Sequence, residues 1–138
     1  MRIVVDTNTV VSGLLWPGPP RRLIDLARAR KYTPCTSVAL MAELAEVIGR
    51  KKFAQRLQAA GLSPAAIVQD YTRLSVIVEP ATLPQPVCRD PDDDLVLATA
   101  LTAQAFLIVS GDLDLLDLRS FRDIRILNAA DALRTLGA

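Results

Sequence analysis

Of the 15 acidic residues in this 138-residue sequence, four lie at separate positions from which they could come together in one site: Asp6, Glu43, Asp94 and Asp112. Asp6 directly follows an apolar run at the amino terminus, and a charge at the end of a buried strand is costly unless it is paired or coordinated. Four carboxylates gathered within a few ångströms would repel one another, which raises pKa values and destabilises the fold. Because Mg²⁺ and Mn²⁺ prefer oxygen ligands and would relieve this repulsion, we expect a metal site.

Two of the acids follow apolar runs that are typical of strands buried on both faces. Ile3-Val4-Val5 leads into Asp6, and residues 106–109 lead into Asp112 across two small residues. In open parallel sheets, ligands bind beyond the carboxyl ends of the strands. We therefore expect Asp6 and Asp112 to lie at the same edge of one sheet.

The other two acids lie in expected helices. Glu43 falls in the second turn of a helix predicted over residues 38–48, where it borders an apolar stripe. Asp94 falls in the first turn of a buried helix that runs to about Gln104. Helix amino ends lie on the same side of such a sheet as the strand carboxyl ends, so both acids are expected near Asp6.

The rest of the chain continues the alternation of strands and helices. This pattern predicts an α/β three-layer sandwich around a mainly parallel sheet, formed by residues 1–138 as a single domain. Further strands are expected over 33–36, 75–78 and 124–127, and further helices over 21–30, 50–60, 64–73 and after Asn128.

The composition excludes several kinds of chemistry. Histidine is absent, which removes serine–histidine and cysteine–histidine catalysis and histidine-ligated zinc. Cys35 and Cys88 have no metal-type or redox spacing and are expected to be free thiols. The sequence shows no signal-type leader and no apolar run approaching 18 residues, so we expect a cytoplasmic protein without a membrane segment.

Charge is unevenly distributed along the chain. Residues 1–60 hold ten Arg and Lys against four Asp and Glu, whereas residues 61–138 hold six against eleven. A basic first half is able to face phosphates while an acidic second half holds metal, although solvated helix faces would give the same counts. The candidate RNA contacts are Arg21, Arg22, Arg50, Lys51, Lys52 and Arg56.

The ordered set of acidic motifs resembles the PIN-domain family of metal-dependent ribonucleases, in particular the toxins of bacterial toxin–antitoxin pairs of VapC type. Order and spacing match from residue 3 to about residue 133. The matching segments are Asp6-Thr7-Asn8, Glu43 in an early helix, Asp94 before Leu97-Ala98-Thr99-Ala100, and Ser110-Gly111-Asp112-Leu113-Asp114.

This resemblance implies a PIN-like fold, cleavage of RNA, a homodimer, and an antitoxin whose tail covers the active site. It implies Mg²⁺ or Mn²⁺ bound by Asp6, Glu43, Asp94 and Asp112. The sequence leaves the identity of two ligands undecided: Asp93 could be the ligand instead of Asp94, and Asp114 could be the ligand instead of Asp112. The residues expected to orient ligands or water around the ion are Thr7, Asn8, Ser110 and Asp114.

Two other functions compete with a nuclease. One is a phosphotransfer enzyme with Asp6 as nucleophile or ligand, but such phosphatases require a second aspartate where this chain has Asn8, and they use a lysine late in the chain. All three lysines here lie in the first half. The other is a catalytically inactive PIN-like RNA-binding or assembly module, which would have no reason to keep a costly cluster of acids.

Overall fold

A six-stranded sheet organises the computed structural model, which describes all of residues 1–138. The strand order is β3-β2-β1-β4-β6-β5, and every neighbouring pair is parallel except β5–β6. The mainly parallel α/β architecture predicted from the sequence is therefore confirmed. The strands are β1 (Arg2–Val5), β2 (Thr33–Thr36), β3 (Val76–Ile77), β4 (Leu107–Val109), β5 (Ser120–Phe121) and β6 (Ile124–Leu127).

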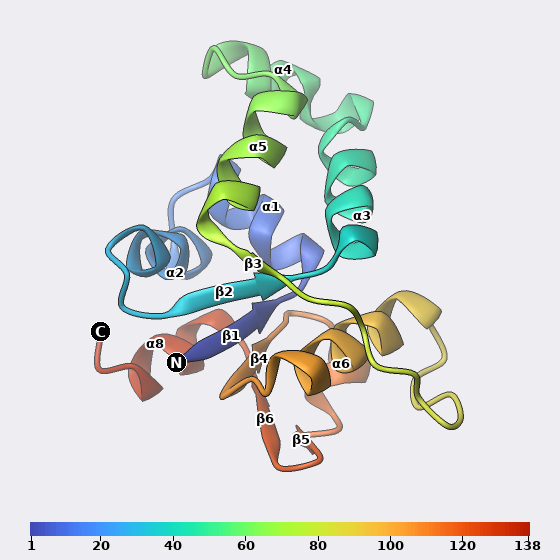
Figure 1. Cartoon of the computed structure of the whole chain (residues 1–138). Helices are drawn as coiled ribbons and strands as arrows, with labels where there is room; N and C mark the ends of the chain where they lie inside the picture. Colours follow the sequence, from blue (N-terminus) through green and yellow to red (C-terminus); the bar gives the residue numbers. More distant parts are fainter.

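Helices cover both faces of this sheet. They are α1 (Thr7–Leu15), α2 (Pro19–Arg28), α3 (Val38–Ile48), α4 (Lys51–Ala59), α5 (Pro64–Leu74), α6 (Pro91–Ala103), α7 (Leu113–Leu116) and α8 (Ala129–Thr135). Figure 1 shows α1, α2 and α8 on one face and α6 on the other, with α3, α4 and α5 extending beyond the β2–β3 end of the sheet. None of these helices is long and apolar enough to cross a membrane.

Successive strand residues point to opposite faces, which creates two cores. Ile3 and Val5 join the larger core with α1, α2, α5 and α8, whereas Val4 joins the smaller core with α6 and Ile126. The two central strands are thus buried on both sides, as the unbroken apolar runs in the sequence indicated.

The structure contains three elements that the sequence did not predict. Helix α1 is rich in β-branched residues, which disfavour helix, and it forms because Asp6 caps it and its apolar side packs into the larger core. Strand β5 and the short helix α7 belong to a compact turn region after β4. Helix α6 also begins earlier than expected, with Asp90 as N-cap and Pro91 in its first turn.

Helices α1 and α2 cross closely at Gly13. A Cβ atom added to Gly13 would lie 2.6 Å from the Pro20 carbonyl oxygen and 2.7 Å from a side-chain carbon of Ile24. Both distances are shorter than any ordinary contact, so the glycine is required by the packing of the two helices.

We expect Gly13→Ala to destabilise the protein by about 1–3 kcal/mol, because the added methyl group forces α1 and α2 apart. Urea unfolding followed by circular dichroism measures this loss. Gly111→Ala is the matched control, because its Cβ would meet nothing within 4 Å and its backbone does not have a positive φ. Equal stability of the two variants would contradict the close-crossing argument.

Candidate metal centre

Adjacent parallel strands bring the first and last of the acids together. Val5 of β1 pairs with Val109 of β4, so the residues that follow both strands emerge at the same edge of the sheet. Asp6 is the N-cap of α1, and Asp112 is the N-cap of α7. The backbone N–H of Asp6 also donates to the carbonyl of Val109 at 2.9 Å, which continues the pairing up to the acid itself.

Ser110 connects these two acids. Its buried hydroxyl donates to Asp6 Oδ2 and accepts from the backbone N–H of Asp112 at 2.9 Å. The other oxygen of Asp6 accepts from the backbone N–H of Thr9 at 2.9 Å. Both oxygens of Asp6 are therefore oriented by the fold, and the Asp112 backbone is held beside them.

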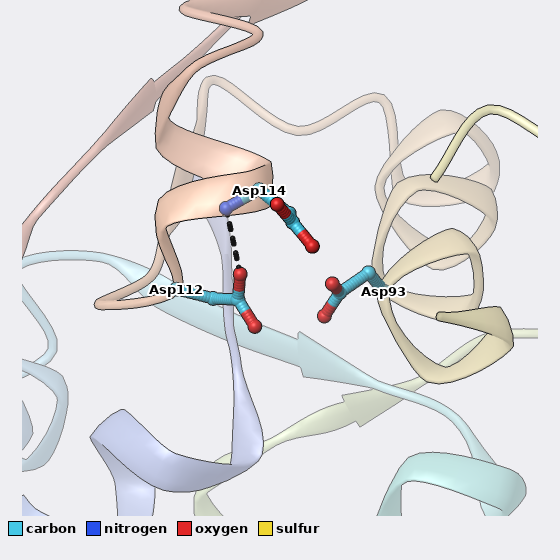
Figure 2. A group of neighbouring side chains, drawn as sticks. All are labelled: Asp93, Asp112 and Asp114. Atoms are coloured by element: carbon cyan, nitrogen blue, oxygen red, sulfur yellow. Dashed lines mark hydrogen bonds between the residues drawn. The ribbon is translucent and has the colours of Figure 1, made fainter. Parts of the chain in front are cut away.

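A group of three carboxylates lies next to Asp6. Asp93, Asp112 and Asp114 each offer an oxygen, and these oxygens all lie within 4.8 Å of one another. Figure 2 shows Asp93 reaching from α6 toward Asp112 and Asp114 at the start of α7. The Asp114 N–H donates to Asp112 Oδ1 at 2.8 Å, which fixes the relative position of these two residues.

Asp94, which the sequence analysis placed in the site, is not part of this group. Its two carboxylate oxygens accept from the backbone N–H groups of Cys88 at 2.7 Å and Val87 at 3.1 Å. They hold the loop before α6, and Asp94 lines a different cavity beside that loop. The structure thus brings Asp93, the alternative left open by the sequence, to the position expected for Asp94.

The helix period explains the choice of Asp93. In α6, Asp93, Val96, Leu97 and Ala100 are all buried and follow the i, i+3, i+4, i+7 spacing of one helix face. Asp94 lies about 100° further round the helix and is only half-buried. In the sequence, the same spacing counted from Asp94 meets Leu97, Ala98 and Leu101, which are also apolar, so the pattern fits both acids and only the burial in the structure selects Asp93.

Glu43 reaches the same region from α3. Its carboxylate accepts from the hydroxyl of Thr7, the buried residue that follows Asp6. Burial raises the pKa of Glu43, the Thr7 hydrogen bond lowers it, and the nearby Asp92 raises it. A cavity of about 180 Å³ lies between these elements, and its lining includes Asp6, Asn8, Glu43, Asp93 and Asp112.

The charges at this cavity are only partly compensated. Glu46, Asp90 and Asp92 add to its acidic lining, and its one basic residue, Arg50, forms an ion pair with Glu46 at 2.8 Å. Burial, and then the neighbouring acids, raise the pKa of Asp93 to about 6. Asp93 Oδ2 is buried and has no hydrogen-bond partner. An all-carboxylate donor set with a free buried oxygen fits a hard divalent cation.

Comparison with known proteins identifies the family and the fold of this chain. A protein-family model described as PIN domain matches residues 2–114. The chain belongs to the PIN-domain family. The fold is similar to a chain in the crystal structure of VapBC2 from Rickettsia felis bound to a DNA fragment from their promoter, with a TM-score of 0.62 and 15% identity over 93% of this chain and 98% of that chain. No curated protein sequence gives a significant match.

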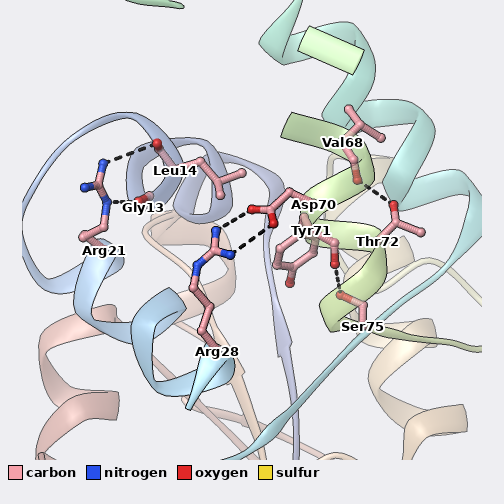
Figure 3. A network of polar contacts seen from close by, with 9 residues as sticks. All are labelled: Gly13, Leu14, Arg21, Arg28, Val68, Asp70, Tyr71, Thr72 and Ser75. Atoms are coloured by element: carbon pink, nitrogen blue, oxygen red, sulfur yellow. Dashed lines mark hydrogen bonds and ion pairs between the residues drawn. The ribbon is translucent and has the colours of Figure 1, made fainter. Parts of the chain in front are cut away.

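Several basic residues of this PIN domain serve the fold. The Arg21 guanidinium donates to the carbonyls of Gly13 at 2.6 Å and Leu14 at 3.3 Å, and Arg56 donates to that of Leu15 at 2.8 Å. These bonds satisfy carbonyl groups at the end of α1 that the helix itself leaves free. Figure 3 shows Arg21 in this role.

The remaining candidate RNA contacts of the PIN domain are exposed. Arg22 lies on α2, and Lys51 and Lys52 begin α4. The Lys52 ammonium lies 5.1 Å from the centre of the Phe53 ring. Arg50, at the rim of the acidic cavity, is the one cation among them that lines the candidate metal centre.

We expect the metal-free protein to lose stability as the pH rises from about 4 to about 6. The pKa of Asp93 is about 6 when folded, against an ordinary 3.8, so between these values the folded state holds a proton that the unfolded state releases. Above pH 6 the ionised group opposes folding. Asp93→Asn should therefore be more stable than wild type by about 1–3 kcal/mol at pH 7.5 in EDTA, measured by urea unfolding.

Asp94→Asn is the matched control for this measurement. An amide has only one acceptor oxygen, so the variant loses one of the bonds to the Val87 and Cys88 N–H groups. We expect it to be less stable than wild type by about 1 kcal/mol at pH 7.5. If Asp93→Asn is no more stable than wild type at pH 7.5, repulsion among the carboxylates does not destabilise the fold.

Proposed function

We propose that this PIN domain is a metal-dependent endoribonuclease that hydrolyses RNA phosphodiester bonds with Mg²⁺ or Mn²⁺. The observation that carries the proposal is the buried, unpartnered oxygen of Asp93 beside Asp112 and Asp114 at the carboxyl edge of the sheet. A buried acceptor without a partner is rare in a stable fold and points to a missing ligand. Membership of a family of nucleases favours catalysis as the use of that ligand.

The proposed ligands are Asp6, Glu43, Asp93 and Asp112, with Asp114 beside them. The ion, when bound, supplies a Lewis acid and an activated water. Thr7 and Ser110 orient the carboxylates of Glu43 and Asp6 through their hydroxyl groups. Asn8 is exposed at the cavity, and its side-chain amide is available to contact the RNA.

Proton transfer in this site falls to carboxylates, because the chain has no histidine. A general base works best when its pKa lies near the operating pH. Burial raises the pKa of Asp93 to about 6 and also raises that of Glu43 in the metal-free protein, and a bound cation would favour the ionised form of both carboxylates, which is the form that accepts a proton. Asp94 has no part in the proposed chemistry, because its oxygens are used by the Val87 and Cys88 N–H groups.

We expect the protein to cleave 5′-labelled RNA with Mg²⁺ or Mn²⁺ and not with EDTA. Asp93→Asn should reduce the rate at least 100-fold, because it removes one charge from the ligand set and weakens metal binding. Gel analysis of the cleavage products under single-turnover conditions measures both effects.

Asp94→Asn controls for the loss of a charge at the same helix end. It should retain activity within about threefold of wild type once folding is verified, since its carboxylate faces the loop. Cleavage that persists in EDTA would contradict metal dependence. RNA binding without cleavage under any metal would instead favour the inactive RNA-binding alternative.

The wider role that we propose is that of a toxin paired with an antitoxin in the cytoplasm, acting as a homodimer. The similarity of fold to a chain of the VapBC2 complex supports it, because that protein is a two-component assembly by its name. We expect a neighbouring gene that encodes a small DNA-binding protein, and co-expression of that protein should inhibit the nuclease. A nuclease unaffected by the neighbouring product would contradict the toxin role.

A further inference from the structure

A second cavity of about 330 Å³ lies beside the acidic one, and the two share Asn8 and Asp112 in their linings. Its walls come from α1, from the start of α2 and α8, and from the segment between β4 and α7. The lining residues are Asn8, Thr9, Ser12, Pro20, Ser110, Gly111, Asp112 and Ala129. The cavity therefore adjoins the place where the scissile phosphate would lie under the proposed function.

The volumes of the two cavities suit different parts of an RNA substrate. Pockets that hold small organic ligands usually measure about 300–1,000 Å³. The acidic cavity, at about 180 Å³, is below this range and suits an ion with its water and a phosphate oxygen. The second cavity, at about 330 Å³, is large enough for an organic group. A nucleotide attached to a phosphate at the acidic cavity must place its base and sugar outside it.

The polar groups of the second cavity are mostly neutral and free. Asn8 and Ser12 lie four residues apart on one face of α1, and neither side chain forms a hydrogen bond within the protein. The Ser110 hydroxyl is buried, and it already donates its proton to Asp6 and accepts from the Asp112 N–H, so it has no donor left for a ligand. Free amide and hydroxyl groups with a single acid nearby suit the edge of a base or a ribose hydroxyl better than another phosphate.

Gly111 supplies a separate observation. Its Cβ position is open, with nothing within 4 Å, and its φ is not positive. Neither backbone strain nor packing within the chain therefore requires a glycine here. A residue without a side chain keeps the mouth of the cavity open to a group that comes from outside the protein.

From these observations we infer that the second cavity is the subsite for the nucleotide that flanks the scissile phosphate, with Asn8 and Ser12 contacting its base or ribose. This inference rests on the proposed function, because it places the phosphate at the acidic cavity. In this proposal Ser12 determines specificity, and its side chain forms no hydrogen bond with the proposed metal ligands.

The experiment uses a short RNA with one mapped cleavage site, made intact or with an abasic residue on either side of the cleaved bond. Wild type, Ser12→Leu and Gly111→Leu are compared, with Thr102→Leu on the exposed face of α6 as the matched control. Ser12→Leu and Gly111→Leu fill the cavity from two directions, so one of them remains informative if the other folds poorly. Circular dichroism and thermal unfolding verify the fold of each variant.

For the intact RNA we expect both filling substitutions to raise KM about tenfold with little change in kcat, and Thr102→Leu to change neither. Removing the base on one side of the cleaved bond should raise the KM of wild type by a similar factor. The same abasic change should leave the KM of Ser12→Leu almost unchanged, because leucine already blocks the subsite. A substitution that merely damaged the fold would penalise all substrates equally.

If Ser12→Leu raises KM over wild type by the same factor for intact and for abasic RNA, the subsite is overturned. Wild-type KM values in both filling variants would overturn it as well. Fluorescence anisotropy with the same oligonucleotides reads binding without cleavage. If wild type fails to cleave, the proposed function fails, but a loss of affinity specific to one abasic position and abolished by Ser12→Leu would still locate the nucleotide in this cavity.

Discussion

Mutual repulsion of carboxylates at the carboxyl edge of β1 and β4 is the constraint on which the site depends. The parallel pairing of Val5 with Val109 carries Asp6 and Asp112 to one place, and α6 adds Asp93 from the other side of the sheet. Burial makes this charge expensive, as the raised pKa of Asp93 indicates. The fold tolerates the cost because two extensive apolar cores hold the strands and helices in place.

Small hydroxyl residues make the arrangement rigid without adding charge. Ser110 connects Asp6 to the backbone of Asp112, and Thr7 donates to Glu43. Neutral donors orient an acid and leave its remaining electron pairs free for a cation. The N-cap positions of Asp6 and Asp112 contribute in the same way, because a helix amino end favours a neighbouring negative charge.

Two adjoining cavities then separate the tasks that the proposed RNA cleavage would require. The smaller one gathers the acids, and the larger one offers neutral polar groups from one face of α1. Asn8 and Asp112 form the boundary between them. The basic residues follow a similar division, since Arg21 and Arg56 complete the end of α1 while Arg50 stays at the rim of the acidic cavity.

The sequence by itself predicted the parallel sheet, because short unbroken apolar runs followed by acids are typical of strands that are buried on both faces and end at a polar edge. It identified Asp6, Glu43 and Asp112 as the residues at that edge, and the structure brings all three to the acidic cavity. The absence of histidine also limits the chemistry to carboxylates, hydroxyls, amides, lysine and arginine.

Only the tertiary structure decided between Asp93 and Asp94. The choice depends on the rotation of α6 against the sheet, which Asp90 and Pro91 set by starting the helix early and which burial of Val96 and Leu97 then fixes. Helix α1 was likewise decided by packing, because its β-branched residues favour strand locally while its apolar side fills the larger core. The second cavity lies between α1, the starts of α2 and α8, and the segment between β4 and α7, and no local sequence pattern specifies such a space.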